Sequence, residues 1–442
     1  MNCKTHDDVL KSVKDLEVSF IQFWFTDVLG VLKSFVVTPQ EIEVGLNEGM
    51  GFDGSSIEGF ARIEESDLVA MPDPSTFQLF PWEDNGVRIA RLICDVVTPD
   101  GQPYEGDSRY VLKRMLKKAA DMGYTWYAGP ELEFFYFKER GSLEPVDDAG
   151  YFDGCPLDLG DPIRRKTILA LQQMGISVEY DHHEVAPSQH EIDLRYSEGM
   201  VMADIVMTYR MLVKEVARRN GLYATFMPKP IYGENGSGMH THQSLFKADR
   251  NEFYDPDGKY HLSEIAKHYT AGLLKHAREI TLVNNQWVNS YKRLVPGFEA
   301  PAYISWARRN RSAMVRIPMY KPGKEKATRI EFRAPDPACN PYLAFATQLA
   351  AGLEGMEQGY ELGDPIEEDI FEMTPAERTK RGIGELPGNL YAAIQATEKS
   401  ELVRKALGDH IFNKFLENKK IEWDKYRVHV SRYEIDNYLS LL

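Results

Sequence analysis

Six residues, spread over about two hundred positions, have side chains that suit a site for two divalent cations. They are Glu131, Glu133, Glu184, Glu191, His240 and Glu331. Each lies in an apolar or aromatic segment that should be buried, where an unpaired carboxylate is costly unless a cation or hydrogen bonds compensate it. An oxygen-rich ligand set with one histidine favours Mg²⁺ or Mn²⁺ over structural zinc. The six residues therefore predict a two-metal site.

Strand alternation gives some of these side chains a common direction. In GPELEFFYF, Glu131 and Glu133 are two residues apart and should share one strand face. In TRIEFRAPD the same spacing places Glu331 between Arg329 and Arg333. An exposed acidic face and a structural ladder of salt bridges remain alternatives for these two motifs taken singly.

Two other segments carry the remaining ligand candidates. Glu184 and Glu191 lie on either side of a proline-containing loop in HHEVAPSQHEIDLRY, so periodicity does not give their direction. His240 and His242 share a face in GSGMHTHQSLF. A neutral imidazole is a good ligand for Mn²⁺, although a single histidine taken alone is more often structural.

A group of basic residues follows in the sequence and would bind anionic substrate groups. It comprises Arg293, Arg308, Arg309, Arg311, Arg316, Lys326, Arg329 and Arg333. Arginine offers a planar, bidentate donor to carboxylate or phosphate, and lysine offers a point charge. For Arg308 and Arg309 we favour the alternative of a solvated basic face. Two metals with arginines indicate phosphoryl transfer, and the chain has no P-loop or kinase glycine-rich motif.

Composition excludes several classes of protein. The 442 residues include 52 Lys and Arg against 67 Asp and Glu, and this net charge of −15 disfavours binding to nucleic acid or to an anionic membrane. No apolar run is long enough to span a bilayer, and the polar start does not resemble a signal peptide. The four cysteines form no CxxC pair, so we expect reduced thiols and a cytoplasmic location.

The order of the expected elements indicates two domains. Residues 17–38 read as a β-hairpin, and a cluster of Pro, Gly and Asp at 98–107 marks the boundary. Ser108 is available to cap the helix that follows. Further helices are expected at 161–174, 198–220, 263–280 and 340–357, and strands near 177–195, 223–228, 239–246, 314–317 and 327–333.

Seven motifs in order make the chain closely resemble class I glutamine synthetase over essentially its whole length. These are FDGSSIEGF, GPELEFF, HHEVAPSQHE, NGSGMHTHQSL, NSYKRLVPGFEAP, RNRSAMVRIP and RIEFRAPDPACNPYLAFA. The resemblance implies an α+β fold with an N-terminal β-grasp domain, 1–103. It also implies a larger C-terminal catalytic domain, 104–442, with a curved antiparallel sheet and helices, the glutamine synthetase/guanidino kinase-like fold. The family assembles as a dodecamer of two hexameric rings, with active sites between subunits.

The same resemblance implies a reaction. ATP phosphorylates L-glutamate to γ-glutamyl phosphate, and ammonia replaces the phosphate to give L-glutamine, ADP and phosphate, a route of nitrogen assimilation. Each active site uses two Mg²⁺ or Mn²⁺ ions, with ATP as a substrate. Glu133, Glu184 and Glu191 resemble the ligands of the first ion. Glu131, His240 and Glu331 resemble those of the second ion, which faces ATP.

Further residues match the family's binding and catalytic positions. Arg311 and Arg333 resemble the arginines that stabilise the phosphate, and Arg293 resembles the clamp on the substrate α-carboxylate. Asn235 and Gly236 resemble the loop that binds the rest of glutamate. The nucleotide set is Glu179, His242, Ser244, Arg316, Lys326 and Arg329. Glu299 resembles the flap residue that closes over the acyl phosphate. Asp53, with Ser56 in its loop, resembles the residue that binds and deprotonates ammonium from the adjacent subunit.

Two departures from the enterobacterial subgroup bear on regulation. Gly384, in GIGELP, stands where that subgroup has an adenylylated tyrosine, so we do not expect adenylylation. Arg62, in GFARIEESD, stands where the subgroup inhibited directly by glutamine has an arginine. The chain therefore resembles the non-adenylylated, feedback-inhibited alpha subgroup. Small nitrogen-regulatory proteins are candidate partners.

Three other functions compete with this interpretation. A ligase for polyamines or other amines would share the metals and ATP, but the intact Asp53 loop favours ammonium. An inactive structural homologue would not need all six ligands together with Glu299. A two-metal hydrolase would leave the arginine-rich segments without a role.

Overall fold

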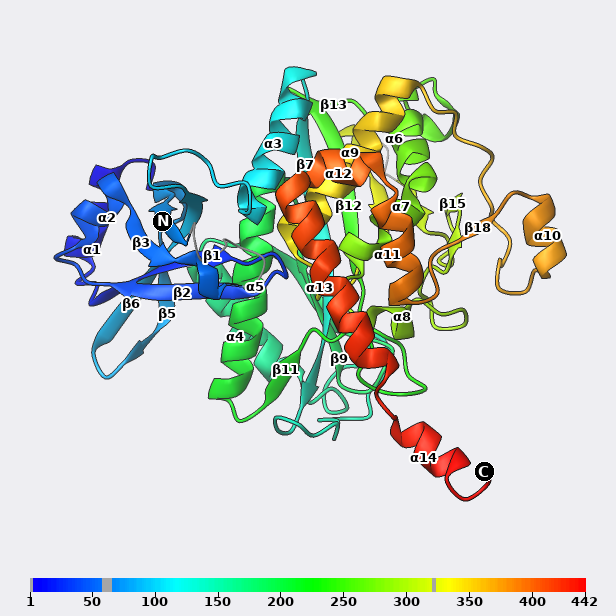
Figure 1. The fold of residues 1–442 in the computed structure, drawn as a ribbon, viewed down its shortest axis with the longest axis horizontal. Helices are drawn as coiled ribbons and strands as arrows, with labels where there is room; N and C mark the ends of the chain where they lie inside the picture. Colours follow the sequence, from blue (N-terminus) through cyan, green and yellow to red (C-terminus); the bar gives the residue numbers. More distant parts are fainter. Residues whose placement is uncertain (1–2, 58–65, 320–322) are drawn as a thin grey trace.

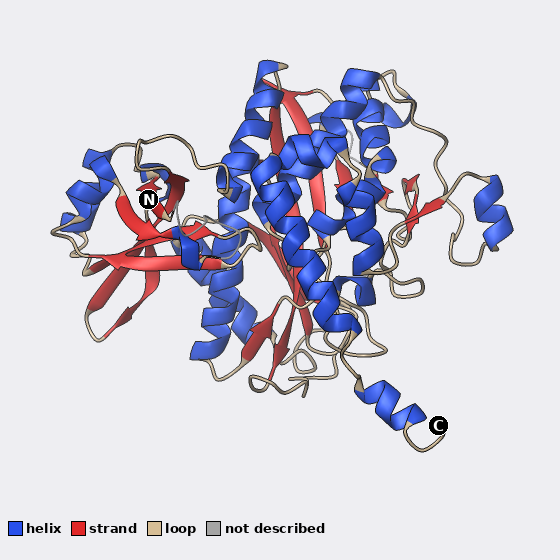
Figure 2. Cartoon of the chain, viewed as in Figure 1, coloured by secondary structure: helices blue, strands red, loops and turns tan. Residues whose placement is uncertain are grey.

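The computed structural model describes residues 3–57, 66–319 and 323–442 of the chain, and it contains two main sheets (Figures 1 and 2). The first sheet has six strands in the order β2-β1-β6-β4-β3, with β5 beside β6. Its strands are β1 (Phe20–Thr26), β2 (Leu32–Val37), β3 (Met50–Asp53), β4 (Asp67–Pro72), β5 (Gln78–Asp84) and β6 (Val87–Val97). Two helices, α1 (His6–Asp15) and α2 (Ile42–Glu48), belong to this part.

The expected hairpin at 17–38 is confirmed, since β1 and β2 pair antiparallel with Phe23 opposite Phe35. The other neighbour of β1 is β6, which runs parallel to it. Phe23 and Leu92, from these two strands, are fully buried in the core of this part. This mixed sheet with its helices agrees with the expected β-grasp arrangement.

The second sheet has ten strands and belongs to the larger part of the molecule. Its main order is β15-β16-β17-β12-β7-β9-β8, with β10 and β11 beside β7 and β13 beside β12. The strands are β7 (Thr125–Phe137), β8 (Val178–His183), β9 (Gln189–Leu194), β10 (Ser197–Glu198), β11 (Tyr223–Thr225), β12 (Met239–Lys247), β13 (Arg250–Asn251), β15 (Trp306–Ala307), β16 (Val315–Arg316) and β17 (Ile330–Phe332). A separate pair joins β14 (Tyr303–Ile304) to β18 (Gly384–Glu385).

Most helices of this part pack around the curved sheet and contribute to the main core (Figure 1). The helices are α3 (Ser108–Asp121), α4 (Asp161–Gln173), α5 (Gly199–Arg219), α6 (Glu264–Lys275), α7 (Ala277–Asn284), α8 (Ser290–Arg293), α9 (Pro341–Gln358), α10 (Pro375–Lys380), α11 (Leu390–Glu398), α12 (Glu401–Leu407), α13 (Asp409–Arg427) and α14 (Arg432–Tyr438). Helices α10 and α14 bury no residue and project from the rest (Figure 1). Helix α9 is buried over most of its length. Among the described residues, no helix is both long and apolar enough to cross a bilayer.

The extended region expected at 177–195 is the antiparallel pair β8 and β9, and the expected proline-containing loop separates the two strands at 184–188. Two other expectations were wrong in detail. The helix expected at 263–280 is divided into α6 and α7, since His276 has non-helical angles of φ −95° and ψ 6°. Asp107, rather than Ser108, caps α3, because Asp107 has extended backbone and its carboxylate accepts the Arg109 N–H at 3.0 Å.

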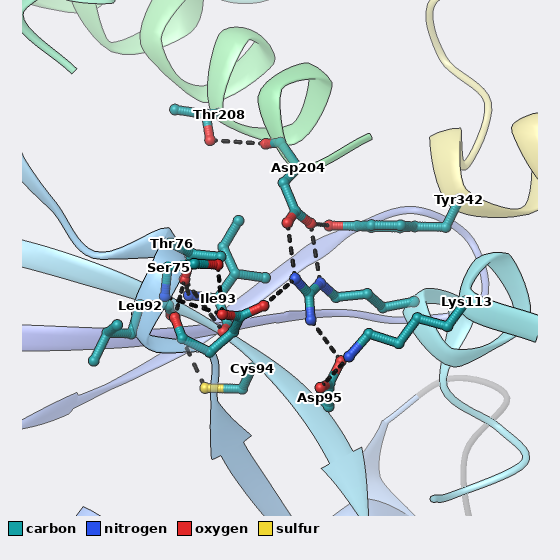
Figure 3. A network of polar contacts seen from close by, with 12 residues as sticks. Ser75, Thr76, Leu92, Ile93, Cys94, Asp95, Lys113, Asp204, Thr208 and Tyr342 are labelled. Carbon is teal, nitrogen blue, oxygen red and sulfur yellow. Dashed lines mark hydrogen bonds and ion pairs between the residues drawn. The ribbon is translucent and has the colours of Figure 1, made fainter. Parts of the chain in front are cut away.

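A buried arginine joins the two parts of the molecule. Arg109 on α3 is 3% exposed and donates to three carboxylates: Asp95 at 2.6 Å, Asp73 at 2.8 Å and Asp204 at 2.9 Å. Asp73 and Asp95 belong to the first part, whereas Asp204 lies on α5. Figure 3 shows Tyr342 from α9 donating to Asp204, at 2.7 Å. One guanidinium therefore holds elements of both parts in register.

We predict that Arg109→Met lowers the free energy of unfolding by about 3 to 5 kcal/mol, because it leaves the buried Asp204 carboxylate without a cation, whereas Asp95 keeps Lys113. Urea unfolding at a fixed protein concentration measures the change. Lys117→Met, on the same helix, is the matched control, since Lys117 and Asp121 form an exposed pair. The control should lose less than about 0.5 kcal/mol. Equal losses in the two variants would contradict a special role for Arg109.

Candidate active site

A small polar cavity of about 170 Å³ collects the predicted metal ligands. All six candidates line it, although they come from four strands and one turn. Other expected site residues in its wall are Asn235, Gly236, Arg293, Glu299, Arg311, Arg316 and Arg333. The fold thus brings together side chains that are up to about two hundred positions apart in the sequence.

The position of β7 at the middle of its sheet explains this convergence. Glu131 lies opposite His240 of β12, and Glu133 lies opposite Glu191 of β9. Because directly opposed residues of antiparallel strands project on the same face, these registers bring ligand candidates from both neighbours to one side of β7. The turn after β8 adds Glu184.

The carboxylates at one end of the cavity repel one another. Burial and the nearby Glu184 raise the pKa of Glu133 to about 8. Burial also raises the pKa of Glu184, and burial with Asp193 raises the pKa of Glu191 well above its usual range. Ionising all three would require compensating positive charge.

Histidine and arginine surround the carboxylates at the other end. Glu131 lies 3.3 Å from His240 Nδ1 and 2.7 Å from His242 Nε2. Burial and Arg333 lower the pKa of His240 to about 4, which leaves its imidazole neutral as a metal ligand must be. Glu331 is fully buried, and Arg333 lies 2.6 Å from it, while Arg316 contacts its other oxygen.

Those contacts determine the charge of Glu331. Burial alone would raise its pKa, but the Arg333 guanidinium holds that pKa at about 2. His240 Nδ1 also lies 3.6 Å from Glu331. His242 and His240 also hold the pKa of Glu131 well below its usual range, against the effect of burial. This end of the cavity therefore has two ionised carboxylates beside the neutral imidazole of His240 at neutral pH.

The donor set fits divalent cations. Among four groups of three described residues whose ligand atoms lie within 4.8 Å of one another, two contain predicted ligands of a common trio: Glu131 with His242 and Glu331, and His182 with Glu184 and Glu191. Each of these two groups overlaps one predicted trio, with a different third member from the one expected. In addition, both carboxylate oxygens of Asp193 are buried without a hydrogen-bond partner in the described structure. Oxygen donors with few nitrogens suit Mg²⁺ or Mn²⁺.

The wall beside the carboxylates is built around Arg293. Its guanidinium is 2% exposed and donates to the carbonyls of Ala334, at 2.8 Å, and Arg333, at 3.1 Å. A Cβ at Gly236 would lie 2.4 Å from the Pro228 carbonyl, so only glycine fits there. Gln189 joins this wall to the ligands, because its amide donates to both Glu133 and Gly236.

A second cavity of about 320 Å³ adjoins the first and shares Glu131 and Tyr180 with it. It contains five of the six residues assigned to the nucleotide: Glu179, His242, Ser244, Lys326 and Arg329. Arg316 differs, since it lines the first cavity and contacts Glu331. Arg329 Nε donates to His242 at 3.1 Å, so the two residues support each other.

The predicted ammonium loop lies away from these cavities. Asp53 ends β3 in the first sheet and lines neither cavity. Its carboxylate accepts from the Ser55 N–H, at 2.8 Å, and from the Ser55 hydroxyl, at 2.7 Å, whereas Ser56 makes no such contact. Arg62 lies outside the described residues.

Sequence reasoning missed several residues of the cavity walls. Tyr151, Tyr180 and His182 line the first cavity, and Tyr127, Asp193 and Tyr196 line the second. His182 and Asp193 lie in the same quoted segment as Glu184 and Glu191, so a spacing argument could have included them. Tyr151 is in a loop without periodicity, and no sequence signal pointed to it.

Comparison with known proteins assigns the fold. Residues 17–99 match the β-grasp domain of glutamine synthetase, and residues 105–438 match its catalytic domain. The glutamine synthetase of Mycolicibacterium smegmatis is 54% identical over 98% of each chain. The glutamine synthetase of Methanosarcina mazei is 50% identical over 100% of this chain and 99% of its own length. The glutamine synthetase of Staphylococcus aureus is 49% identical over 99% of this chain and 98% of its own length.

Solved structures agree with this assignment. The GmaS/ADP complex is 32% identical, with a TM-score of 0.89 over 98% of this chain and 99% of the other. The glutamine synthetase of Plasmodium falciparum, solved by cryo-electron microscopy, is 26% identical, with a TM-score of 0.90 over 99% of each chain. With both domains matched in order and the ligand candidates gathered in one cavity, the chain belongs to the glutamine synthetase family.

Proposed function

We propose that this chain ligates ammonia to L-glutamate with ATP, and that the two adjoining cavities divide this work. The observation that carries the proposal is the shared wall: Glu131 faces both the carboxylate-rich cavity and the cavity with the nucleotide residues. A nucleotide in the second cavity would therefore present its terminal phosphate to glutamate in the first. In-line transfer requires such a juxtaposition.

The cations belong in the first cavity. Glu133, Glu184 and Glu191 would hold one ion, and Glu131, His240 and Glu331 the other, with His182 and His242 close enough to take part. When bound, Mg²⁺ or Mn²⁺ would neutralise the phosphate and carboxylate oxygens and polarise them. The raised pKa values of Glu133, Glu184 and Glu191 support this arrangement, since cations would stabilise their ionised forms.

The remaining side chains would orient the substrate and exclude water. Arg293 would clamp the α-carboxylate, and Asn235 and Gly236 would bind the amino end of glutamate. Arg311 and Arg333 would stabilise charge that develops during phosphoryl transfer. Glu299, at a positive φ of 54° in the cavity wall, belongs to the flap that would shield γ-glutamyl phosphate from water.

We predict ADP release and glutamine formation in equal amounts from L-glutamate, ATP and ammonium when Mg²⁺ or Mn²⁺ is present. Excess chelator should abolish both products, and added metal should restore them, because the carboxylates need cations to bind anionic substrates. Parallel assays with polyamines and methylamine test the nucleophile. Preference for an amine other than ammonium would contradict the assigned substrate, and the absence of turnover with every amine would favour an inactive homologue.

We further propose that the active chain is a homo-oligomer, a dodecamer of two hexameric rings, with Asp53 completing the site of a neighbouring subunit. The exposed position of Asp53 away from its own cavities supports this proposal. The C-terminal segment with α14 projects from the body of the chain (Figure 1), and its apolar side chains are exposed. They include Val428, Val430, Tyr433, Leu439, Leu441 and Leu442. A partner surface would bury them.

Mixed oligomers test the origin of Asp53. Asp53→Ala should lose ammonium-dependent turnover but keep ATP binding, and Arg333→Met should lose turnover through the cavity. If Asp53 acts on a neighbour, oligomers from equal coexpression of the two variants should regain about one quarter of wild-type activity, because that share of sites pairs two intact halves. No recovery would indicate that Asp53 serves its own chain.

We propose that the chain belongs to the non-adenylylated subgroup that glutamine inhibits directly through Arg62. Gly384 at the modification position supports the absence of adenylylation. We predict that Arg62→Ala retains wild-type turnover while the glutamine concentration for half-inhibition rises at least about tenfold, since a bidentate donor to the inhibitor is lost. Initial rates measured at increasing glutamine concentrations give the concentration for half-inhibition of each variant. Unchanged inhibition would remove Arg62 from the proposal.

A further inference from the structure

We propose that Lys229 is a positioning residue that couples the glutamate-binding loop to closure of the flap. The proposal rests on the proposed ligase function and adds a residue to its machinery. Lys229 lies in the segment between β11 and β12. The proposed glutamate-binding residue Gly236 follows it by seven positions in the same segment. Its ammonium group contacts both structures that must act together before an acyl phosphate can be aminated.

The first contact is with the flap. The Lys229 Nζ lies 3.8 Å from the centroid of the Phe298 ring, at cation–π distance. Phe298 directly precedes Glu299, and both residues line the first cavity. Gly297 and Glu299 have positive φ angles of 92° and 54°, and this conformation is strained at Glu299, which is not glycine.

The second contact is with the glutamate-binding loop. The same Nζ donates a hydrogen bond to the carbonyl of Glu234, the residue that precedes Asn235 and Gly236. A flexible lysine therefore bridges a carbonyl next to the amino-acid-binding groups and a ring next to the flap glutamate. When glutamate fixes the loop at Glu234, the hydrogen bond would fix the position of the Lys229 ammonium group. The ammonium group would in turn hold the Phe298 ring next to Glu299.

The backbone of Lys229 is anchored independently of these contacts. Its N–H donates to the Asn289 side chain at 2.8 Å, and the Asn289 amide donates to its carbonyl at 3.0 Å. Burial lowers the pKa of the half-buried Lys229 ammonium, which is consistent with a cation removed from water, where a cation–π contact is stronger. By contrast, within the described residues the backbone of 296–301 makes no hydrogen bond. Side-chain contacts must therefore hold the flap tip.

The consequence of losing this bridge would be a specific side reaction. With the flap open, a water oxygen attacks the γ-carbonyl carbon of γ-glutamyl phosphate, and the bond from that carbon to the phosphate oxygen breaks. Phosphate leaves with the bonding electrons, and the water protons pass to phosphate and solvent. Glutamate is regenerated, so the net reaction is hydrolysis of ATP to ADP and phosphate. ADP then forms without glutamine.

The test measures ADP and glutamine in the same reaction, using the full chain with saturating glutamate, ATP, Mg²⁺ and ammonium. We expect about one ADP per glutamine for the wild type and an increase of about fivefold in this ratio for Lys229→Met, as loss of one partly buried cation–π contact implies. Lys229→Arg keeps a cation over the ring and should restore a ratio near that of the wild type. ADP release without ammonium should rise in parallel in the methionine variant.

Phe298→Leu removes the other partner and leaves Lys229 intact, so it tests the contact even if Lys229→Met folds poorly. Phe298→Leu should raise the ratio of ADP to glutamine to a similar extent. The double variant should have a ratio no higher than that of the single variant with the larger ratio, because both changes remove the same contact. Lys214→Met is the matched control, because Lys214 also lies over an aromatic ring, Phe226 at 5.7 Å, but does not line either cavity. Its ratio should not change.

A ratio that stays near one in Lys229→Met, whether or not the rate falls, would overturn the proposal, because a merely structural role lowers both products together. An unchanged ratio in Phe298→Leu would overturn it as well. These results differ from failure of the ligase assignment. In that case the wild type itself would form no glutamine from ammonium.

Discussion

Six carboxylates, five of them predicted metal ligands, line one cavity of about 170 Å³, and they cannot all be ionised there without compensating positive charge. This electrostatic constraint organises the rest of the site. Raised pKa values mark the end with Glu133, Glu184 and Glu191, where burial and repulsion between the carboxylates outweigh the nearby Arg293 guanidinium. At the other end, Arg333 and Arg316 hold Glu331 ionised before any ligand arrives. One end therefore depends on bound metal more than the other.

A rigid framework keeps this unfavourable cluster together. Two interactions offset the repulsion between the carboxylates. Strand β7 pairs with strands on both sides, and its opposite face packs into the apolar core, where Leu132 and Phe134 are fully buried. Arg109 extends the framework to the N-terminal part by pairing with carboxylates from both parts. Strand pairing and buried ion pairs thus fix most of the ligand candidates, whereas the cavity walls around Asn235 and Phe298 belong to no helix or strand.

Much of the fold could be predicted from periodicity and turn chemistry. The hairpin of β1 and β2, the long strand β7 and the helices α3, α5 and α9 lie within a few residues of their expected bounds. The errors share one physical cause. Local patterns do not report where a continuous periodic segment breaks, as at His276. Backbone angles likewise decide which of two neighbouring residues, such as Asp107 and Ser108, becomes the N-cap of a helix.

The sequence by itself determined the family, the six metal-ligand candidates and the common direction of Glu131 and Glu133, because these depend on residue types and local spacing. Only the tertiary structure decided which distant segments meet. The tertiary structure places His182 and Tyr151 in the wall of the first cavity and pairs Arg316 with Glu331. It places Asp53 outside both cavities of its own chain. Strand register and packing between segments far apart in sequence produce these contacts, and neither leaves a signal in any single motif.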